Sequence, residues 1–212
     1  MKKRRLIGNE EACSSDDHDR SVTRSARRIV IVAVPPVRTL DVFGPAEVFG
    51  EANDLHGRDP VYQVEIVSAT TDRIVSSHIG TPVHTNRTYG ECHGPIDTLL
   101  VAGGMGARDM QYERAFLQWL RDRSISARRF GSICTGAFVL AEAGLLDGRR
   151  ATTHWNWANE LATIRAYASI RIRFTFATAT AIHRPASRLV STFVLRSWKT
   201  IWAEPYRLKL RR

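Results

Sequence analysis

Segments with the pattern of β-strands, some continuous apolar runs and one alternating, recur along the middle of the chain. They lie at residues 29–34, 61–67, 96–102 and 130–133. The first run contains only Ile, Val and Ala, which is typical of a parallel strand covered on both faces. Between residues 74 and 85, Gly80-Thr81-Pro82 separates two short β-prone pieces, and this indicates a hairpin. The pattern therefore predicts a sheet and one additional hairpin.

Helical periodicity fills the segments between these strands. Apolar residues recur at helical spacing after Asp41, with Gly57 as the stop, and residues 135–146 predict another helix closed by Asp147-Gly148. A helix over residues 112–127 would place four residues on one face, namely Phe116, Trp119, Leu120 and Ser124. Strands that alternate with helices build a mostly parallel sheet with helices on both faces. We therefore predict an α/β three-layer sandwich of the flavodoxin-like or Rossmann-like class.

Residues suited to chemistry follow three of the predicted strands. Asp41 comes after the first strand, Gly103-Gly104 after the strand at 96–102, and Cys134 after the strand at 130–133. Ligands of open parallel sheets bind at the carboxyl ends of the strands, so we expect these positions to lie together. Gly103 and Gly104 could supply backbone N–H groups to an oxyanion or carboxylate, and Asp41 could hydrogen-bond the cysteine or a substrate.

Cys134 lies in a segment of small residues that spans 131–137, Gly-Ser-Ile-Cys-Thr-Gly-Ala. The segment resembles a nucleophile elbow, in which a strand turns sharply into a helix and the central side chain stands clear. The positive end of the helix dipole and the amides near Thr135 are expected to lower the thiol pKa from about 8.5. His154, in the segment Ala-Thr-Thr-His-Trp, is a candidate base or orienting residue.

Each of these residues also has a structural interpretation. A lone cysteine after an apolar run is commonly a buried structural thiol, although the small and polar neighbours of Cys134 favour the functional interpretation. His154 near aromatic residues would be a hydrogen-bonded structural residue, and Asp41 would begin the following helix as a cap. Cys92 and Cys13 are interpreted as incidental. Because the chain has no Cys-x-x-Cys pair, we expect no disulfide framework and no zinc site, and we expect no cofactor.

Charge is distributed unevenly. The formal net charge is +10, and residues 163–212 contain eleven Lys and Arg against one acid, Glu204, so the remainder is neutral. Residues 1–26 are polar and are expected to form a disordered arm, because they have little apolar surface to bury. No run approaches the roughly 18–20 apolar residues of a membrane helix. We predict a cytoplasmic protein with no membrane association, a folded domain at 28–162 and a basic tail at 163–212.

Four motifs occur in order along the predicted domain. They are Thr-Leu-Asp-Val-Phe-Gly-Pro-Ala-Glu-Val-Phe at 39–49, Leu-Leu-Val-Ala-Gly-Gly at 99–104, Ser-Ile-Cys-Thr-Gly-Ala at 132–137 and Ala-Thr-Thr-His-Trp at 151–155. Together they resemble the ThiJ/PfpI superfamily within the class I glutamine amidotransferase-like fold, and in particular the amino-terminal sensor domain of AraC-type transcriptional regulators. The resemblance implies that Cys134 is the elbow cysteine, Asp41 the acid beside it, Gly104 part of the oxyanion region and His154 the histidine after the elbow helix.

Two departures from the superfamily change what the resemblance implies. Peptidase-like members have His directly after the elbow cysteine, whereas this chain has Thr135, so a Cys-His hydrolase of that type is disfavoured. Isocyanide hydratases of the superfamily share the Leu-Asp, Cys-Thr-Gly and Thr-Thr-His-Trp patterns, which leaves enzymatic activity open. In addition, the AraC-type regulators carry a downstream helix-turn-helix domain that residues 163–212 do not resemble.

The resemblance ends abruptly after Leu161. Our hypothesis is a frameshift near Thr163, because suitable synonymous codons for residues 170–178 and 195–210 yield regulator-like segments in a shifted register. The nucleotide sequence of the gene tests this hypothesis, which requires an uninterrupted family-like frame at that offset.

These observations lead to three functional hypotheses. The preferred one is a ligand-sensing domain of an AraC-family regulator that lacks its DNA-binding domain, binds an unidentified small molecule and forms a homodimer. The alternative is a hydratase or hydrolase with Cys134 as nucleophile and Asp41 as proton-transfer partner. Nonspecific DNA binding by the basic tail is the weakest hypothesis, and we expect no specific nucleic-acid binding.

Overall fold

The computed structural model describes residues 25–56, 60–109, 111–149, 151–165 and 179–183. Its strands are β1 (Arg27–Ala33), β2 (Tyr62–Ser68), β3 (Ile74–Ser76), β4 (Pro82–His84), β5 (Arg87–Thr88), β6 (Thr98–Val101), β7 (Arg129–Ile133) and β8 (Ala179–His183). Its helices are α1 (Thr39–His56), α2 (Gly106–Asp109), α3 (Arg114–Ser126), α4 (Gly136–Glu142) and α5 (Ala158–Arg165), with short 3-10 turns η1 (Tyr89–Glu91) and η2 (Trp155–Trp157). The predicted arm and most of the predicted tail lie outside the described residues. The frameshift hypothesis concerns that tail and stays a prediction.

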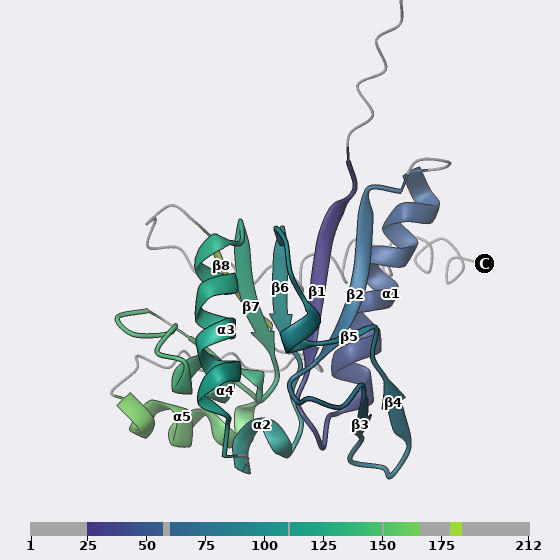
Figure 1. Cartoon of the computed structure of the whole chain (residues 1–212). Coiled ribbons are helices and arrows are strands. Elements are labelled where there is room, and N and C mark those ends of the chain that lie inside the picture. Colours follow the sequence, from purple (N-terminus) through teal and green to yellow (C-terminus); the bar gives the residue numbers. More distant parts are fainter. Residues whose placement is uncertain (1–24, 57–59, 110, 150, 166–178, 184–212) are drawn as a thin grey trace, which may run out of the picture.

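The central sheet has six strands in the order β5-β2-β1-β6-β7-β8 (Figure 1). Every pairing is parallel except that of β7 with β8, which is antiparallel. The chain runs from β1 to β2 on one side and later returns to β6 on the other side of β1. Such a reversal opens a crevice beyond the carboxyl ends of the two strands that flank it. The pair β1 and β6 therefore marks the expected position of a ligand.

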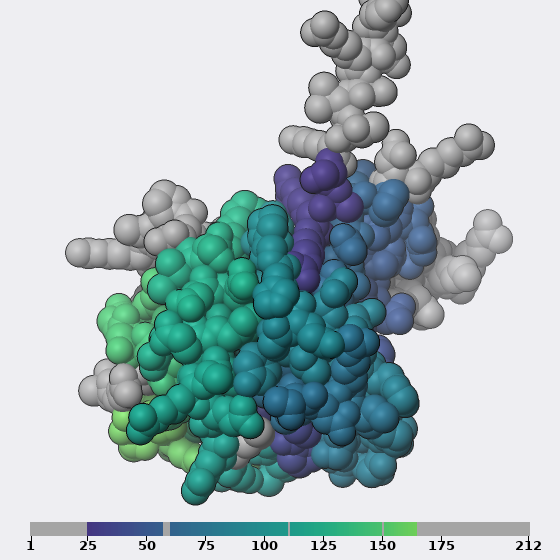
Figure 2. Space-filling view, viewed as in Figure 1, coloured from purple at the N-terminus to yellow at the C-terminus, as the bar shows by residue number. Residues whose placement is uncertain are grey.

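Alternate side chains of β1 enter two different cores, because successive residues of a strand point to opposite faces. Val30 and Val32 pack with Phe116 and Leu120 of α3 and with residues of α4, whereas Ile29, Ile31 and Ala33 pack with Val42 of α1. Figure 1 shows α1 and the pair α3 and α4 on opposite faces of the sheet, and in Figure 2 the start of β1 is visible in purple near the top of the molecule. The predicted three-layer α/β fold is confirmed.

Most predicted elements are present, with shifted ends. The hairpin over residues 74–85 is the antiparallel pair β3 and β4, which forms a separate small sheet. The helix expected over residues 135–146 was predicted too long, since α4 ends at Glu142 and Gly144 takes a left-handed φ of 69°. Asp41 is the third residue of α1, because this helix begins at Thr39. None of the helices in the described part of the chain combines the length and apolarity needed to cross a bilayer.

Candidate functional site

Three segments meet at the carboxyl ends of β1, β6 and β7, which are adjacent strands of the sheet. The Arg38 N–H donates to the Gly103 carbonyl oxygen at 2.9 Å, and Val37 forms isolated bridges with both Gly104 and Ser77. These backbone contacts fix the segment before α1 against the turn after β6. A Cβ atom at Gly103 would lie 2.5 Å from Asp41 Oδ2 and 2.8 Å from Cys134 Cβ. The structure thus brings Asp41, Gly103, Gly104 and Cys134 together.

Cys134 occupies the turn between β7 and α4 in a left-handed conformation, with φ 53°. A side chain other than glycine adopts this region only at a cost, so the surrounding contacts must hold it there. One of these contacts is the hydrogen bond from Thr153 Oγ1 to the Cys134 carbonyl oxygen, at 3.0 Å. Another is the close approach of α4 to β6, where a Cβ on Gly136 would collide with the Val101 carbonyl oxygen.

Asp41 is a buried carboxylate, with 4% of its surface exposed. Burial raises its pKa to about 6, while the positive charge of Arg38, hydrogen bonds from the Cys134 thiol and the Gly103 N–H, and the charge of His78 oppose that rise. Oδ2 itself has no hydrogen-bond partner among the described residues. Since buried polar atoms are normally satisfied, an unpartnered carboxylate oxygen marks a position where a ligand donor is missing.

The Cys134 thiol does not have the lowered pKa that the sequence led us to expect. Burial, followed by the negative charge of Asp41, raises the pKa to about 11, and the hydrogen bonds from Thr135 and the charge of Arg38 only partly oppose these effects. Cys134 is 8% exposed, and α4 has only seven residues. The expectation of a thiolate is therefore corrected: desolvation outweighs the short helix and its amides, so the thiol is protonated at neutral pH.

Thr135 connects the turn after β7 to the turn after β6. Its Oγ1 accepts a hydrogen bond from the Gly104 N–H at 2.9 Å and donates one to the Gly104 carbonyl oxygen at 2.8 Å. Both groups are buried. The Gly104 N–H, which was a candidate oxyanion donor, is thus directed at the Thr135 hydroxyl, and the Gly103 N–H is directed at Asp41.

His154 lies at the edge of the site. Its Nδ1 accepts a hydrogen bond from the Asn156 N–H at 3.3 Å, and its ring stacks on exposed Trp155 with centroids 5.4 Å apart. Partial burial and the charge of Arg38 lower the His154 pKa. No hydrogen bond between described residues joins His154 to Cys134 or Asp41, so a Cys-His pair is not formed.

Sequence reasoning missed Arg38, His78 and Ser77. Arg38 and His78 are exposed, and their charges act on Asp41, whereas Ser77 is buried with its Oγ unpartnered among the described residues. Arg38 directly precedes the first motif segment, three residues before Asp41, and only that proximity could have drawn attention to it. A search of the described residues for three or more clustered His, Cys, Asp or Glu side chains that could hold a metal ion found none.

Comparison with known proteins gives this site a family context. The sequence profile of the DJ-1/PfpI family matches residues 27–173. The chain belongs to the DJ-1/PfpI family. The match covers β1 to α5 and therefore every site segment described above.

Proteins with different functions are similar to this chain. The HTH-type transcriptional regulator CdhR of Pseudomonas aeruginosa is 61% identical over 122 residues, which are 58% of this chain and 35% of the regulator. The isonitrile hydratase of Pseudomonas putida is 33% identical over 141 residues, which are 66% of this chain and 58% of the hydratase. A ThiJ/PfpI family protein from Pseudomonas syringae superposes with a TM-score of 0.60 at 25% identity, over 78% of this chain and 66% of that protein.

Proposed function

We propose that this chain is a ligand-sensing domain of the kind found in AraC-type transcriptional regulators, with Cys134 on a nucleophile elbow inside the ligand site. The observation that carries the proposal is the buried pair of Asp41 and Cys134. A thiol with a pKa near 11 is almost entirely protonated at neutral pH, and the thiol form is a poor nucleophile. The same pair, with its unpartnered Asp41 Oδ2, is suited to hold a ligand by hydrogen bonds.

The amides near Cys134 support binding over covalent catalysis. A hydratase or hydrolase needs donors directed at the charge that develops in its transition state. Here the Gly104 N–H is directed at Thr135 Oγ1 and the Gly103 N–H at Asp41. The identity of 61% with a transcriptional regulator over 122 residues supports the same choice.

A cysteine-dependent hydratase is the second candidate, and one observation favours it. Asp41 has a pKa near 6 and accepts a hydrogen bond from the thiol, so it is placed to take the proton as Cys134 attacks an electrophilic carbon. In this alternative Cys134 forms the new bond to carbon, Asp41 carries the proton, and the Thr135 side chain rotates to release the Gly104 N–H. The similarity to isonitrile hydratase supports it as well.

Turnover of an aryl isonitrile separates the two candidates. The sensor proposal expects the native chain and the Cys134→Ser variant to consume the isonitrile at the same background rate, followed by ultraviolet absorbance. Turnover by the native chain that disappears in Cys134→Ser would overturn the sensor proposal in favour of the hydratase.

Ligand binding gives the positive test. A thermal-shift screen of small metabolites is expected to yield a compound that raises the melting temperature of the native chain and of Cys134→Ser by similar amounts. The reason is that a ligand that binds only the folded state stabilises that state by mass action. A library in which every stabilising compound needs the sulfur of Cys134 would contradict a binding role independent of covalent chemistry.

A further inference from the structure

Arg38 is an exposed positive charge close enough to act on the Asp41 carboxylate. Its side chain is exposed and forms no ion pair with any residue in the described ranges. Its backbone is fixed on both sides, since its N–H donates to the Gly103 carbonyl oxygen at 2.9 Å and its carbonyl accepts from the Asp41 N–H at 3.0 Å. The Arg38 side chain therefore starts between the two segments that hold the Asp41 carboxylate.

The charge of Arg38 reaches the other site residues. It contributes to the pKa values of Asp41, Cys134 and His154, in each case in the direction expected for a nearby positive charge. The backbone contacts agree with these effects, because they hold Arg38 against the turn after β6. An arginine presents a planar fork of N–H donors that matches a carboxylate.

The neighbouring segment, residues 77 and 78, adds further polar groups near Asp41. The His78 N–H donates to the Val37 carbonyl oxygen at 3.0 Å, and the exposed His78 side chain is near enough to act on Asp41. Ser77, bridged to Val37, is 4% exposed, and its Oγ has no partner among the described residues. Arg38 and His78 thus add two exposed hydrogen-bond donors near Asp41, and Ser77 adds a buried hydroxyl next to His78.

The interior has the opposite requirement. Asp41 Oδ2 is buried and unpartnered, so a ligand atom that meets it must donate a hydrogen bond. A carboxylate turned toward Asp41 would be repelled, and a cation turned toward Arg38 would be repelled as well.

We propose that the site binds a small organic acid that carries a hydroxyl or amino group beside its carboxylate, with the carboxylate on Arg38 and the donor on Asp41 Oδ2. This inference rests on the proposed ligand-binding function and specifies the class of ligand. It assigns to Arg38 the recognition of the anionic group, which no motif of the sequence indicated.

Alkylation of Cys134 by an anionic and a neutral reagent tests the role of Arg38. In both reactions the sulfur of the thiolate bonds to the reagent's methylene carbon and iodide leaves with the bonding electron pair. The probes are iodoacetate and iodoacetamide, and the readout is the labelling rate of the Cys134 peptide by mass spectrometry. Any change in thiolate population alters both rates equally, so the ratio of the two rates reports attraction of the anion.

Arg38→Gln is expected to lower the iodoacetate-to-iodoacetamide ratio about fivefold, which corresponds to an exposed charge pair of about 1 kcal/mol. Arg27→Gln is the matched control, because Arg27 is an exposed arginine at the opposite end of β1. The control is expected to keep the native ratio. An unchanged ratio in Arg38→Gln, or an equal fall in both variants, overturns the proposal.

Protection experiments test the donor. Acetate and glycolate differ by one hydroxyl, and each is titrated against iodoacetamide labelling of Cys134 in the native chain. Glycolate is expected to protect at a concentration several-fold lower than acetate, because only glycolate donates to Asp41 Oδ2. Equal protection, or none by either acid, overturns the proposal. Neither experiment measures isonitrile turnover or uses the metabolite screen, so a failure here leaves the sensor proposal standing.

Discussion

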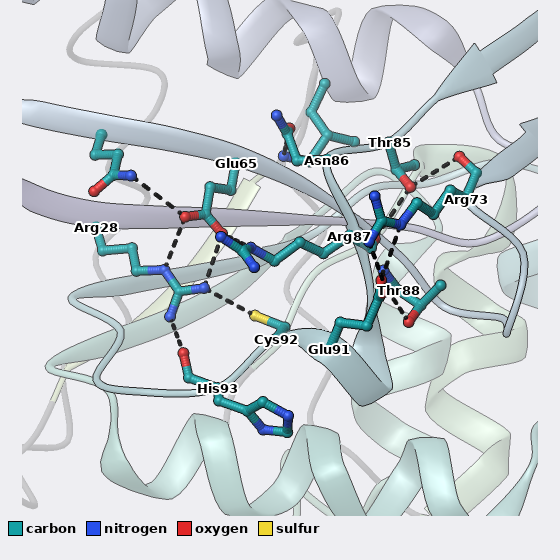
Figure 3. Close-up of polar contacts among 12 residues, drawn as sticks. Arg28, Glu65, Arg73, Thr85, Asn86, Arg87, Thr88, Glu91, Cys92 and His93 are labelled. Carbon is teal, nitrogen blue, oxygen red and sulfur yellow. Dashed lines mark hydrogen bonds and ion pairs between the residues drawn. The ribbon is translucent and has the colours of Figure 1, made fainter.

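Cys92 and Cys134 are both buried beside ionisable side chains, but the charges around them are arranged differently. At the amino end of β1, Arg28 donates through Nε and Nη2 to the Glu65 carboxylate at 3.2 and 2.8 Å, and Nη2 also approaches Cys92 Sγ at 3.4 Å (Figure 3). Arg87 contacts Glu65 from the other side at 3.4 Å. At the carboxyl end of the strands, Asp41 Oδ2 has no hydrogen-bond partner among the described residues, and the Arg38 guanidinium forms no ion pair with any of them.

The difference separates charges that serve folding from charges that are available to a ligand. The hydrogen bond from Arg28 lowers the Glu65 pKa, so this carboxylate is stabilised in its ionised form by its neighbours. Burial raises the Asp41 pKa instead, so this carboxylate is held in a place that disfavours its charge. Retaining such a group is a cost to stability that a ligand can offset.

The largest expected effect concerns the reactivity of the two cysteines. The rate of Cys134 alkylation by iodoacetamide should rise about tenfold per pH unit, and about a thousandfold from pH 7 to pH 10, because the thiolate fraction grows until the pKa near 11 is reached. Cys92, with no exposed surface, should stay unlabelled in the folded chain. Peptide mass spectrometry over this pH range measures both rates. A Cys134 rate that levels off near pH 8 would show a low thiol pKa.

Filling the space at Gly103 should disrupt the packing around Cys134 and leave the surroundings of Cys92 unchanged. In Gly103→Ala the new Cβ would lie 2.5 Å from Asp41 Oδ2 and 2.8 Å from the Thr135 nitrogen, and overpacking of this kind costs about 2–3 kcal/mol. Gly90→Ala is the matched control near Cys92, because its Cβ would meet only Thr88 Oγ1, at 4.0 Å. Urea unfolding of both variants measures the free energy of unfolding. Equal stability of the two would contradict the packing around Gly103.

Removing the charge of Glu65 should disrupt the ion pairs at the amino end of β1. Glu65→Gln leaves Arg28 and Arg87 side by side without their carboxylate, and we expect a loss of about 2 kcal/mol in the free energy of unfolding. Glu91→Gln removes the partner of Arg73 at an exposed pair and is expected to change stability little. Thermal denaturation compares the two variants. A larger loss in Glu91→Gln would reverse the assignment.

The smallest expected effect is the pH dependence that Asp41 contributes. Its folded-state pKa of about 6 exceeds the ordinary 3.8, so the folded chain binds the extra proton and this contribution to stability falls as the pH rises between these values. Asp41→Asn removes the contribution. The stability of Asp41→Asn relative to the native chain should therefore rise by about 2 kcal/mol from pH 4 to pH 7 in urea titrations. A pH-independent difference would show that Asp41 is not destabilised by burial.

Much of the fold could be predicted because local pattern and burial agree. The apolar run of β1 can be satisfied only by cover on both faces, and the two core clusters provide it. The length of α4 could not be predicted, since Ala143 to Gly148 continues an apolar pattern that ends in turns with left-handed glycines at 144 and 148. The short strand β5 carries no periodic signal of its own and forms by pairing with β2.

The site was predictable only in its location. The rule that ligands lie at the carboxyl ends of parallel strands brings Asp41, Gly103 and Cys134 to one edge, and the structure places them there. It could not indicate that the Gly104 N–H is directed at Thr135, because that hydrogen bond joins residues 31 positions apart. Nor could it indicate Arg38, an exposed residue whose importance depends on which groups surround it.

The sequence by itself determined the order of strands and helices and the small residues around Cys134, because hydrophobic periodicity and the steric needs of a tight turn are local properties. Only the tertiary structure decided the protonation of Cys134 and Asp41 and the placement of the Arg38 charge near both. Those properties follow from desolvation and from charges on three separate segments, and both arise only when the chain is folded.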